Sequence, residues 1–305
     1  MTAARAIVNP SSGRERAPEY LDLLEARLKE HFSPVDIVLT AGEGDARRAA
    51  AAAVVDGCRQ LFVAGGDGTL NEALNGVMEA GGLEATTFGV VPLGTGNDFA
   101  AALDIPEEIE RAVDVLIRGR TVSVDVGEVN GRAFVNTSGG GFIAEVSQAV
   151  SPQLKTIAGR LAYLVGGAQA LLEYEPVRAT VGLEPGGERL GLGLHAFAVC
   201  NSRLIGGGRL IAPEAIIDDG LLDVCLIEAM STLEFVTLAR KVAAGDHVGD
   251  PRVRYHRASV ISMTFDREIA INTDGEVLSA RECQYGVRSR AARFLAGEAP
   301  FVSKA

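Results

Sequence analysis

The chain has 305 residues, of which 47% are hydrophobic and 23% are charged, as in an ordinary globular protein and unlike a disordered one. Its 29 Lys and Arg residues against 40 Asp and Glu residues give a net charge of −11, which disfavours a nucleic-acid partner because phosphate backbones need a positive protein surface. The amino terminus lacks the apolar core of a signal peptide, and no apolar run approaches the roughly 20 residues that span a bilayer. We therefore expect a soluble, cytoplasmic protein with about two domains.

Strands and helices alternate over the first 100 residues. Apolar runs predict strands at residues 3–8, 35–39, 61–64 and 87–91. Apolar side chains at helical spacing predict helices at residues 20–32, 46–57 and 70–78. Asp45 is expected to be the N-cap of the second helix. This alternation is typical of a parallel sheet covered by helices, in which ligands bind at the carboxyl ends of the strands.

The pattern changes near residue 121. Asn130-Gly131 lies between two alternating segments and predicts a two-residue hairpin turn. Ser231 and Glu234 form a capping box that starts a short helix, and a longer helix is expected at residues 153–174. Further strands are expected at residues 177–184, 189–200, 221–228, 258–265, 267–272 and 283–288. Many short strands joined by turns indicate an antiparallel sandwich, with a domain boundary near residue 126.

The four cysteines lie far apart, without a Cys-x-x-Cys pair. Because each lies in an apolar run, we expect buried free thiols in a reducing compartment. These residues are Cys58, Cys200, Cys225 and Cys283.

The segment Gly65–Thr69 (GGDGT) is the strongest local signal of chemistry. It joins a predicted strand to a predicted helix, whose free N–H groups and dipole can bind phosphate, and its glycines allow a phosphate to approach the main chain. The carboxylate of Asp67 would repel phosphate unless a cation lies between them, so the segment implies Mg²⁺. The alternative is an ordinary glycine-rich turn in which Asp67 caps the helix.

A second glycine-rich segment, Pro92–Ala100 (PLGTGNDFA), follows the next predicted strand. Thr95 offers a hydroxyl group there and Asp98 another carboxylate. Alone, the segment is equally consistent with a turn and a helix cap at Asn97 or Asp98. Two such loops at neighbouring strand ends favour one shared site.

Six motifs in a fixed order span nearly the whole chain and resemble those of the bacterial diacylglycerol kinase-like lipid kinases, relatives of the sphingosine and ceramide kinases. They are NPSSG (9–13), GGDGTLNE (65–72), PLGTGNDFA (92–100), VDVG (124–127), GGGRLIAPEAIIDDGLLDV (206–224) and TDGE (273–276). GGDGT is shared with NAD kinases and phosphofructokinases, whereas PLGTGNDFA together with APEA and DDGLLD is much more specific.

The resemblance implies an α/β plus all-β fold with a cleft between two domains. A parallel-sheet domain at residues 1–126 would bind ATP, and an antiparallel β-sandwich domain at residues 127–287 would bind the lipid. Residues 288–305 would return to the first domain.

The resemblance also implies roles for individual residues. The nucleotide contacts would be Asn9, Thr40, Gly65, Gly66, Asp67, Gly68, Thr69, Asn71, Glu72 and Thr95. The acids that organise a catalytic Mg²⁺ would be Asp67, Asp98 and Asp125. A separate structural metal would bind the side chain of Asp219 and the carbonyl groups of Ile216 and Leu221. Glu276 would be the catalytic base, and Asp274 would only shape the turn before it.

These features together predict an ATP- and Mg²⁺-dependent lipid kinase that acts on a hydroxyl group of a lipid such as diacylglycerol. The alternatives are an NAD kinase-like enzyme and a nucleotide-responsive lipid-binding regulator without turnover. A homodimer is an expectation from the family alone.

The lipid would be met at the inner face of the membrane, by transient peripheral contact. Arg14 and Lys155, near the predicted helix at 153–174, are candidates for that contact. The basic run formed by Arg252, Arg254 and Arg257 is better interpreted as a solvated strand face.

Overall fold

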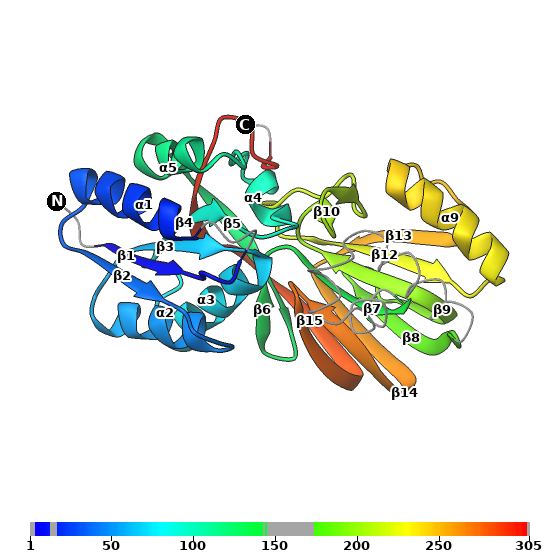
Figure 1. The fold of residues 1–305 in the computed structure, drawn as a ribbon. Coiled ribbons are helices and arrows are strands. Elements are labelled where there is room, and N and C mark those ends of the chain that lie inside the picture. Colours follow the sequence, from blue (N-terminus) through cyan, green and yellow to red (C-terminus); the bar gives the residue numbers. More distant parts are fainter. Residues whose placement is uncertain (1–3, 13–16, 143, 145–173, 304–305) are drawn as a thin grey trace.

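The computed structural model describes residues 4–12, 17–142, 144 and 174–303 (Figure 1). Arg14, Lys155 and the predicted helix at 153–174 lie outside these residues. Two parts of the molecule lie side by side, a helix-covered part that contains the amino terminus and a part built mainly of strands (Figure 1).

The first part is a sheet with helices on both faces. Its strands pair in parallel in the order β4-β3-β1-β2, with Ala4–Val8 of β1 in register with both neighbours. The strands are β1 (Ala4–Val8), β2 (Val35–Leu39), β3 (Gln60–Gly65) and β4 (Thr87–Pro92). The helices are α1 (Ala17–His31), α2 (Asp45–Val55), α3 (Asp67–Glu79), α4 (Asp98–Ala102) and α5 (Ile109–Arg118).

Two apolar clusters fill the spaces between this sheet and its helices. Side chains of α2 and α3, such as Ala50 and Leu74, pack against one face of the sheet. Side chains of α1 and α5, such as Leu28 and Val113, pack against the other face. The carboxyl ends of the central strands are thereby left open to the loops that follow them.

The second part is antiparallel. Its elements include the helix α9 (Thr232–Ala244), whose predicted capping box between Ser231 and Glu234 is confirmed. The strands are β6 (Arg132–Phe134), β7 (Thr137–Gly141), β8 (Val177–Glu184), β9 (Glu188–Cys200), β10 (Leu204–Ile205), β11 (Arg209–Leu210), β12 (Leu222–Glu228), β13 (Val253–Ala258) and β14 (Val260–Thr273). One apolar cluster lies inside this strand layer, and another lies between β9, β12 and α9.

Two long strands join the parts into one sheet of thirteen strands. They are β5 (Arg120–Val129) and β15 (Glu276–Ala296), which pair with each other, while Arg293 and Phe294 of β15 also pair with β4 in parallel. The boundaries expected at residues 126 and 287 both fall inside these strands. Phe301 and Val302, beyond β15, pack against the core of the first part.

Several sequence predictions about element bounds need correction. The expected runs at 258–265 and 267–272 form one strand, β14, with an irregularity between Thr264 and Ile269, and the expected run at 283–288 is only the middle of the 21-residue β15. Asp45 is the first residue of α2 and Gly44 is its N-cap, because Gly44 adopts φ +78° and the carboxylate of Asp45 accepts N–H groups from Ala41 and Gly42. Other predictions hold: Asn130 and Gly131 form the expected turn, both with positive φ.

The basic run at the edge strand β13 is neutralised by acids. Arg252 pairs with Asp250 at 2.8 Å, Arg254 with Glu228 at 2.6 Å, and Arg257 with Asp219. The interpretation as an ordinary strand face is therefore favoured over a membrane patch.

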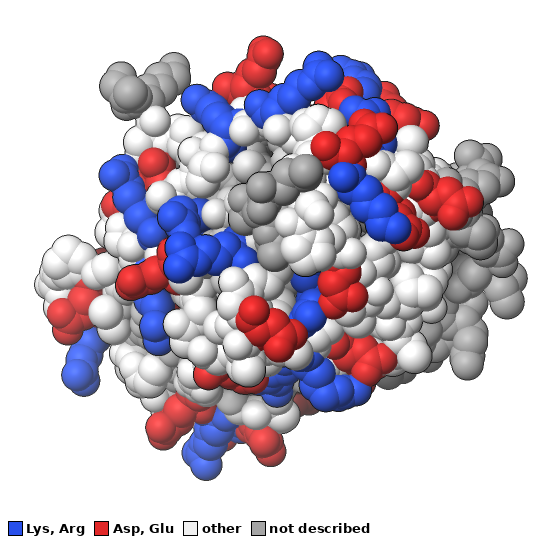
Figure 2. Space-filling view, turned by 90° about the vertical axis from the view of Figure 1, so that its left-hand side faces the viewer, with Lys and Arg blue, Asp and Glu red and all other residues white. Residues whose placement is uncertain are grey.

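The end of the first part seen in Figure 2 carries basic and acidic side chains in alternation. In the same part of the molecule, Arg5 of β1 forms ion pairs with Asp36 and Asp56. In the described ranges, no helix combines the length and the apolar character needed to cross a membrane. Cys200, Cys225 and Cys283 are buried thiols as expected, whereas Cys58 is only half-buried.

Candidate active site

The first glycine-rich segment is shorter as a loop than the sequence suggests. Gly65 ends β3, Gly66 is the N-cap of α3, and Asp67 is already the first helical residue. A Cβ atom on Gly65 would lie 2.6 Å from the side chain of Thr69, so glycine is required there. The free N–H groups of α3 are therefore presented at the end of a central strand, as phosphate binding requires.

The second glycine-rich segment lies directly against the first. A Cβ atom on Gly94 would lie 2.6 Å from the Cα atom of Gly66. Asn97, in a left-handed conformation, closes the turn by accepting the Gly94 N–H and donating to the Gly94 carbonyl, both at 2.8 Å. The predicted meeting of the two loops at neighbouring strand ends is confirmed.

Asp67 and Asp98 lie next to each other, and backbone amides hold both carboxylates. Asp67 accepts the N–H groups of Asp98 at 3.2 Å and Phe99 at 3.1 Å, at the start of α4. Asp98 accepts the N–H groups of Gly207 and Gly208 from the second part. Loss of solvent raises the pKa of Asp67, and the charge of Asp98 adds to this effect.

A cavity of about 260 Å³ opens beside these carboxylates, lined by Thr95, Gly96, Asp98 and Gly207 among others. A Cβ atom on Gly96 would lie 3.2 Å from one oxygen of Asp67 and 3.4 Å from one of Asp98. The absence of a side chain on Gly96 thus leaves space between two oxygen donors, which are the ligands that Mg²⁺ prefers.

Asp125 is not part of this pair. Its carboxylate is fully buried and accepts the N–H groups of Gly220 and Arg290, each at 2.6 Å. Burial raises its pKa, and the charge that adds to this effect is that of Asp219. Among the described residues, no three His, Cys, Asp or Glu side chains are close enough to share a metal ion. The structure therefore does not bring Asp67, Asp98 and Asp125 together as one metal site.

The residues expected to contact the nucleotide fall into two groups. Asn9 donates to the hydroxyl group of Thr69 at 3.0 Å, and exposed Thr95 faces the cavity. The side chains of Asn71 and Glu72 instead bind protein groups: Asn71 donates to the Ala133 carbonyl at 2.9 Å, and Glu72 accepts the Ala46 N–H at 3.2 Å.

Thr40 and Gly68 complete the set. Thr40 is buried directly after β2, and its N–H donates to the carbonyl of Val8. Gly68 lies in the first turn of α3 and faces the turn at Gly275, where an added Cβ atom would lie 3.7 Å from the Gly68 Cα atom.

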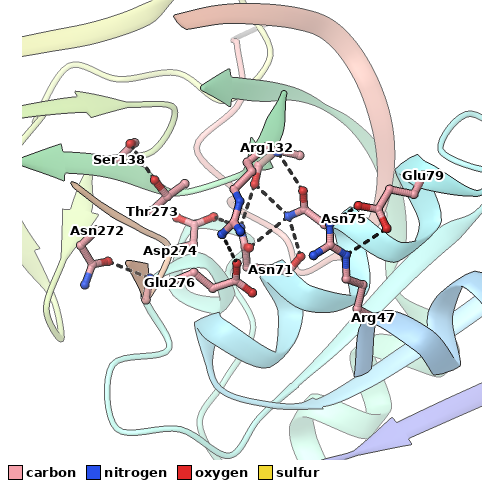
Figure 3. Close-up of polar contacts among 12 residues, drawn as sticks. Arg47, Asn71, Asn75, Glu79, Arg132, Ser138, Asn272, Thr273, Asp274 and Glu276 are labelled. Carbon is pink, nitrogen blue, oxygen red and sulfur yellow. Dashed lines mark hydrogen bonds and ion pairs between the residues drawn. The ribbon is translucent and has the colours of Figure 1, made fainter. Parts of the chain in front are cut away.

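Glu276 is the first residue of β15, and the charges of Glu72 and Arg47 from the first part of the molecule act on it. Its carboxylate pairs with Arg132 of β6 at 3.0 Å and is 28% exposed (Figure 3). Burial raises the pKa of Glu276, while Arg132 and Arg47 act in the opposite direction. A carboxylate with a raised pKa can act as a general base.

Asp274 has a larger role than the turn that the sequence suggests. It adopts φ +47° and forms a two-residue turn with Gly275, but its carboxylate is buried. It accepts the N–H groups of Val135 at 2.8 Å and Thr137 at 2.7 Å, and the side-chain amide of Asn71 at 3.3 Å. Burial outweighs these hydrogen bonds and raises the pKa of Asp274 to about 7.

Comparison with known proteins agrees with this arrangement. Residues 3–129 match the family described as Diacylglycerol kinase catalytic domain, and residues 136–296 match the YegS C-terminal NAD kinase beta sandwich-like domain. A diacylglycerol kinase of Bacillus subtilis is 34% identical over 277 residues, which cover 90% of each chain. One of Staphylococcus aureus strain MRSA252 is 33% identical over 273 residues, covering 90% of this chain and 85% of that protein. The chain belongs to the diacylglycerol kinase family.

A solved structure extends this likeness to the fold. The crystal structure of a diacylglycerol kinase from Bacillus anthracis strain Sterne matches with a TM-score of 0.80 over 97% of each chain, at 24% identity. The catalytic domain followed by a β-sandwich-like domain is thus the architecture of this family member.

The segment expected to hold a second metal in this diacylglycerol kinase family member leads directly into β12. Asp219 accepts the Leu221 N–H at 3.0 Å and pairs with Arg257 of β13. Its carboxylate and the carbonyl groups of Ile216 and Leu221 are donors that suit a hard cation. Arg257 already holds one of the Asp219 oxygens, so a cation there would compete with a guanidinium group.

Sequence reasoning missed Asn75 and Arg132, and it gave Asp274 only the turn before Glu276. Each acts through a partner more than 50 residues away in the sequence, such as Ala133 for Asn75. The available signal was the pair Asn71 and Asn75, four residues apart and therefore on one face of the predicted helix.

Proposed function

We propose that this chain is an ATP-dependent lipid kinase that transfers the γ-phosphoryl group to a hydroxyl group of diacylglycerol, giving phosphatidic acid. The observation that carries the proposal is the hydrogen bond from Asn71 in α3 to Asp274 at 3.3 Å, which holds the turn before Glu276 against the start of that helix. The names of the relatives support the lipid acceptor.

The amino-terminal N–H groups of α3 would hold the phosphates, because the helix dipole and the free amides favour anions there. Thr69, Asn9 and Thr95 would add polar contacts from the same side. Asp67 and Asp98 would hold Mg²⁺, which supplies charge neutralisation for the transferred phosphoryl group when it is bound. Asp125 would support the chain around Gly220 and Arg290 instead.

Glu276 would accept the proton of the lipid hydroxyl group as it attacks the γ-phosphorus atom. A lipid alcohol is a weak nucleophile at neutral pH, and general-base catalysis contributes roughly 10²–10⁴-fold. The ion pair with Arg132 opposes the effect of burial on the pKa of Glu276 and so favours the deprotonated form, which is the form that a base needs.

Each of the two parts would bind one of the two substrates. We propose that residues 1–126 with 288–305 bind ATP and that residues 127–287 bind the lipid. The lipid would be taken from the inner face of the membrane by transient contact, and two copies of the chain would form a homodimer.

The experiment incubates the purified protein with γ-labelled ATP, Mg²⁺ and a panel of diacylglycerol, phosphatidylglycerol, a sphingoid base and NAD. We expect labelled phosphatidic acid from the wild type and a product yield lower by roughly 10²–10⁴ from Glu276→Gln. Labelled NADP would overturn the proposal in favour of an NAD kinase. Tight ATP binding without any labelled product would favour the non-catalytic regulator.

A further inference from the structure

A buried network of hydrogen bonds ties the nucleotide-facing helix to the strands of the second part (Figure 3). Asn71 and Asn75 project from the same face of α3 toward β6. Asn75 donates to the carbonyl of Ala133 at 3.0 Å and accepts its N–H at 2.9 Å, and Asn71 donates to the same carbonyl at 2.9 Å. Both asparagine side chains are buried, so this polar network is shielded from water.

Asp274 is the junction of that network. One carboxylate oxygen accepts the N–H groups of Asn136 at 3.2 Å and Thr137 at 2.7 Å. The other oxygen accepts the N–H of Val135 at 2.8 Å and the amide of Asn71 at 3.3 Å. The backbone N–H of Asp274 also donates to the carbonyl of Thr137 at 2.9 Å.

The segment held by Asp274 is the chain crossing between the two domains. The catalytic-domain match ends at residue 129 and the sandwich match begins at residue 136, so Val135–Thr137 lie where one domain passes into the other. Asp274 thus binds the crossing and α3 at the same time.

Glu276 is fixed by the same turn. Asp274 and Gly275 are the two central residues of a hairpin whose closing pair is Thr273 and Glu276. Because a two-residue turn leaves little freedom to the residues that it joins, the position of Asp274 determines the position of the Glu276 backbone. The hydrogen bonds of the Asp274 carboxylate therefore also hold the turn that precedes Glu276.

We propose that Asp274 is a positioning residue that aligns Glu276 with the nucleotide-facing end of α3, with Asn71 and Asn75 as its link to the helix. This inference rests on the proposed function, since it assigns Asp274 no effect except through Glu276. A misplacement of about 1 Å at a reacting group can reduce a rate by roughly 10²-fold.

Aspartate is the residue type that this position requires. The four N–H donors around Asp274 need acceptors on both carboxylate oxygens. Asparagine has the same shape but carries one acceptor oxygen and an NH₂ group that would face other donors. Asp274→Asn thus disturbs the position of the turn with little change in side-chain volume.

The test is a double-mutant cycle in the full-length protein. Asp274→Asn is made in the wild type and in Glu276→Gln, and kcat and the KM for ATP are measured with diacylglycerol in detergent micelles. We expect Asp274→Asn to lower kcat by roughly 10–100-fold in the wild type and to leave the KM for ATP within about twofold, because the phosphate-binding amides are intact. In the Glu276→Gln background the same substitution should lower kcat by less than about threefold.

Two further variants separate positioning from general destabilisation. Thr86→Val removes a buried hydroxyl group that donates to the Gly82 carbonyl at 2.9 Å, outside the network, and is the control for lost stability. Asn75→Ala weakens the network without changing the turn, and remains informative if Asp274→Asn does not fold. We expect Asn75→Ala to show the same background dependence as Asp274→Asn, and Thr86→Val to leave kcat unchanged.

The outcomes are distinct. Equal losses of kcat in both backgrounds, for Asp274→Asn or for Asn75→Ala, would overturn the positioning role while leaving Glu276 as the base. Near-normal kcat for Glu276→Gln alone would overturn the base assignment of the proposed function, and the positioning role with it.

Discussion

Two acidic regions of the molecule hold their carboxylates with different partners. In the first region, Asp67, Asp98 and Asp274 accept N–H groups, and no Lys, Arg or His among the described residues forms an ion pair with them. Around the edge strand β13, Asp219 and Asp250 are paired with guanidinium groups. Amides fix the position of an acid without cancelling its charge, whereas arginines cancel it. The first region can therefore attract a cation, and the second mainly adds stability.

The pKa values follow the same division. Burial raises the pKa of Asp67, and that of Asp274 to about 7. Arg252 and Lys241 hold the pKa of Asp250 well below its usual range. Asp223 is an intermediate case, because burial raises its pKa to about 6 although the hydroxyl group of Tyr255 donates to it at 2.6 Å.

The largest effect is expected from Asp67→Ala. Loss of this carboxylate at the start of the proposed phosphate-binding helix should reduce kcat by roughly 10³-fold or more, because charge stabilisation is the main contribution of protein to phosphoryl transfer. Steady-state kinetics with diacylglycerol and ATP is the measurement, and circular dichroism should show an unchanged fold.

Asp45→Ala is the matched control for this variant. Asp45 is likewise the first residue of a helix and accepts two backbone N–H groups, but it lies at α2. We expect its kcat to stay within about twofold of the wild type. Equal losses for the two variants would mean that Asp67 is only a helix-start residue.

The sequence was informative where structure depends on neighbours in the chain. The turn at Asn130-Gly131 and the capping box of Ser231 need only a few adjacent residues, and both are present. The role of Asp274 could not be predicted, because its amide partners lie 137 to 139 residues earlier. Residue type alone also could not separate Asp125 from Asp67 and Asp98, since the partners of each carboxylate come from distant segments.

Arg132→Gln tests whether the positive charge of Arg132 lowers the pKa of Glu276, the proposed base. Arg132 lowers the pKa of Glu276, so its removal should raise that pKa further. As the proposed base, Glu276 acts in its deprotonated form, so the acidic limb of the pH–rate profile should move to higher pH, which lowers kcat by roughly 3- to 10-fold at pH values on that limb.

Arg288→Gln is the control, because Arg288 forms a similar exposed pair with Glu128 at 2.8 Å. Its pH–rate profile should match that of the wild type. An acidic limb of Arg132→Gln at the same pH as that of the wild type would show that the ion pair does not tune Glu276.

Asp250→Asn tests the arginine-rich region for stability. The side chain of Asp250 is 1% exposed and binds Lys241 and Arg252, so the free energy of unfolding should fall by about 2–3 kcal/mol. Its folded pKa lies below its unfolded value, so its contribution is present above about pH 4 and is lost as the pH falls below that value. Urea unfolding at pH 7 and pH 3 should show a gap between variant and wild type that narrows at pH 3, while kcat at pH 7 is unchanged. A gap of equal size at both pH values would contradict a charge-based contribution.

The smallest effect is expected at Asp219, where Arg257 and a cation would compete for the same carboxylate. The guanidinium group of Arg257 pairs with Asp219 and lies 3.8 Å from Asp223. Because an exposed ion pair contributes little, Arg257→Gln without Mg²⁺ should change the free energy of unfolding by less than about 1 kcal/mol.

With Arg257 gone, the Asp219 carboxylate and the carbonyl groups of Ile216 and Leu221 are free to bind a cation, and Mg²⁺ should raise the Tm of Arg257→Gln more than that of the wild type. Arg254→Gln is the control, because Arg254 pairs with Glu228 on the same strand. Asp219→Asn should remove the response to Mg²⁺ in either background. An equal response in Arg257→Gln and Arg254→Gln would show that Asp219 belongs with the acids that arginines neutralise and not with those that bind cations.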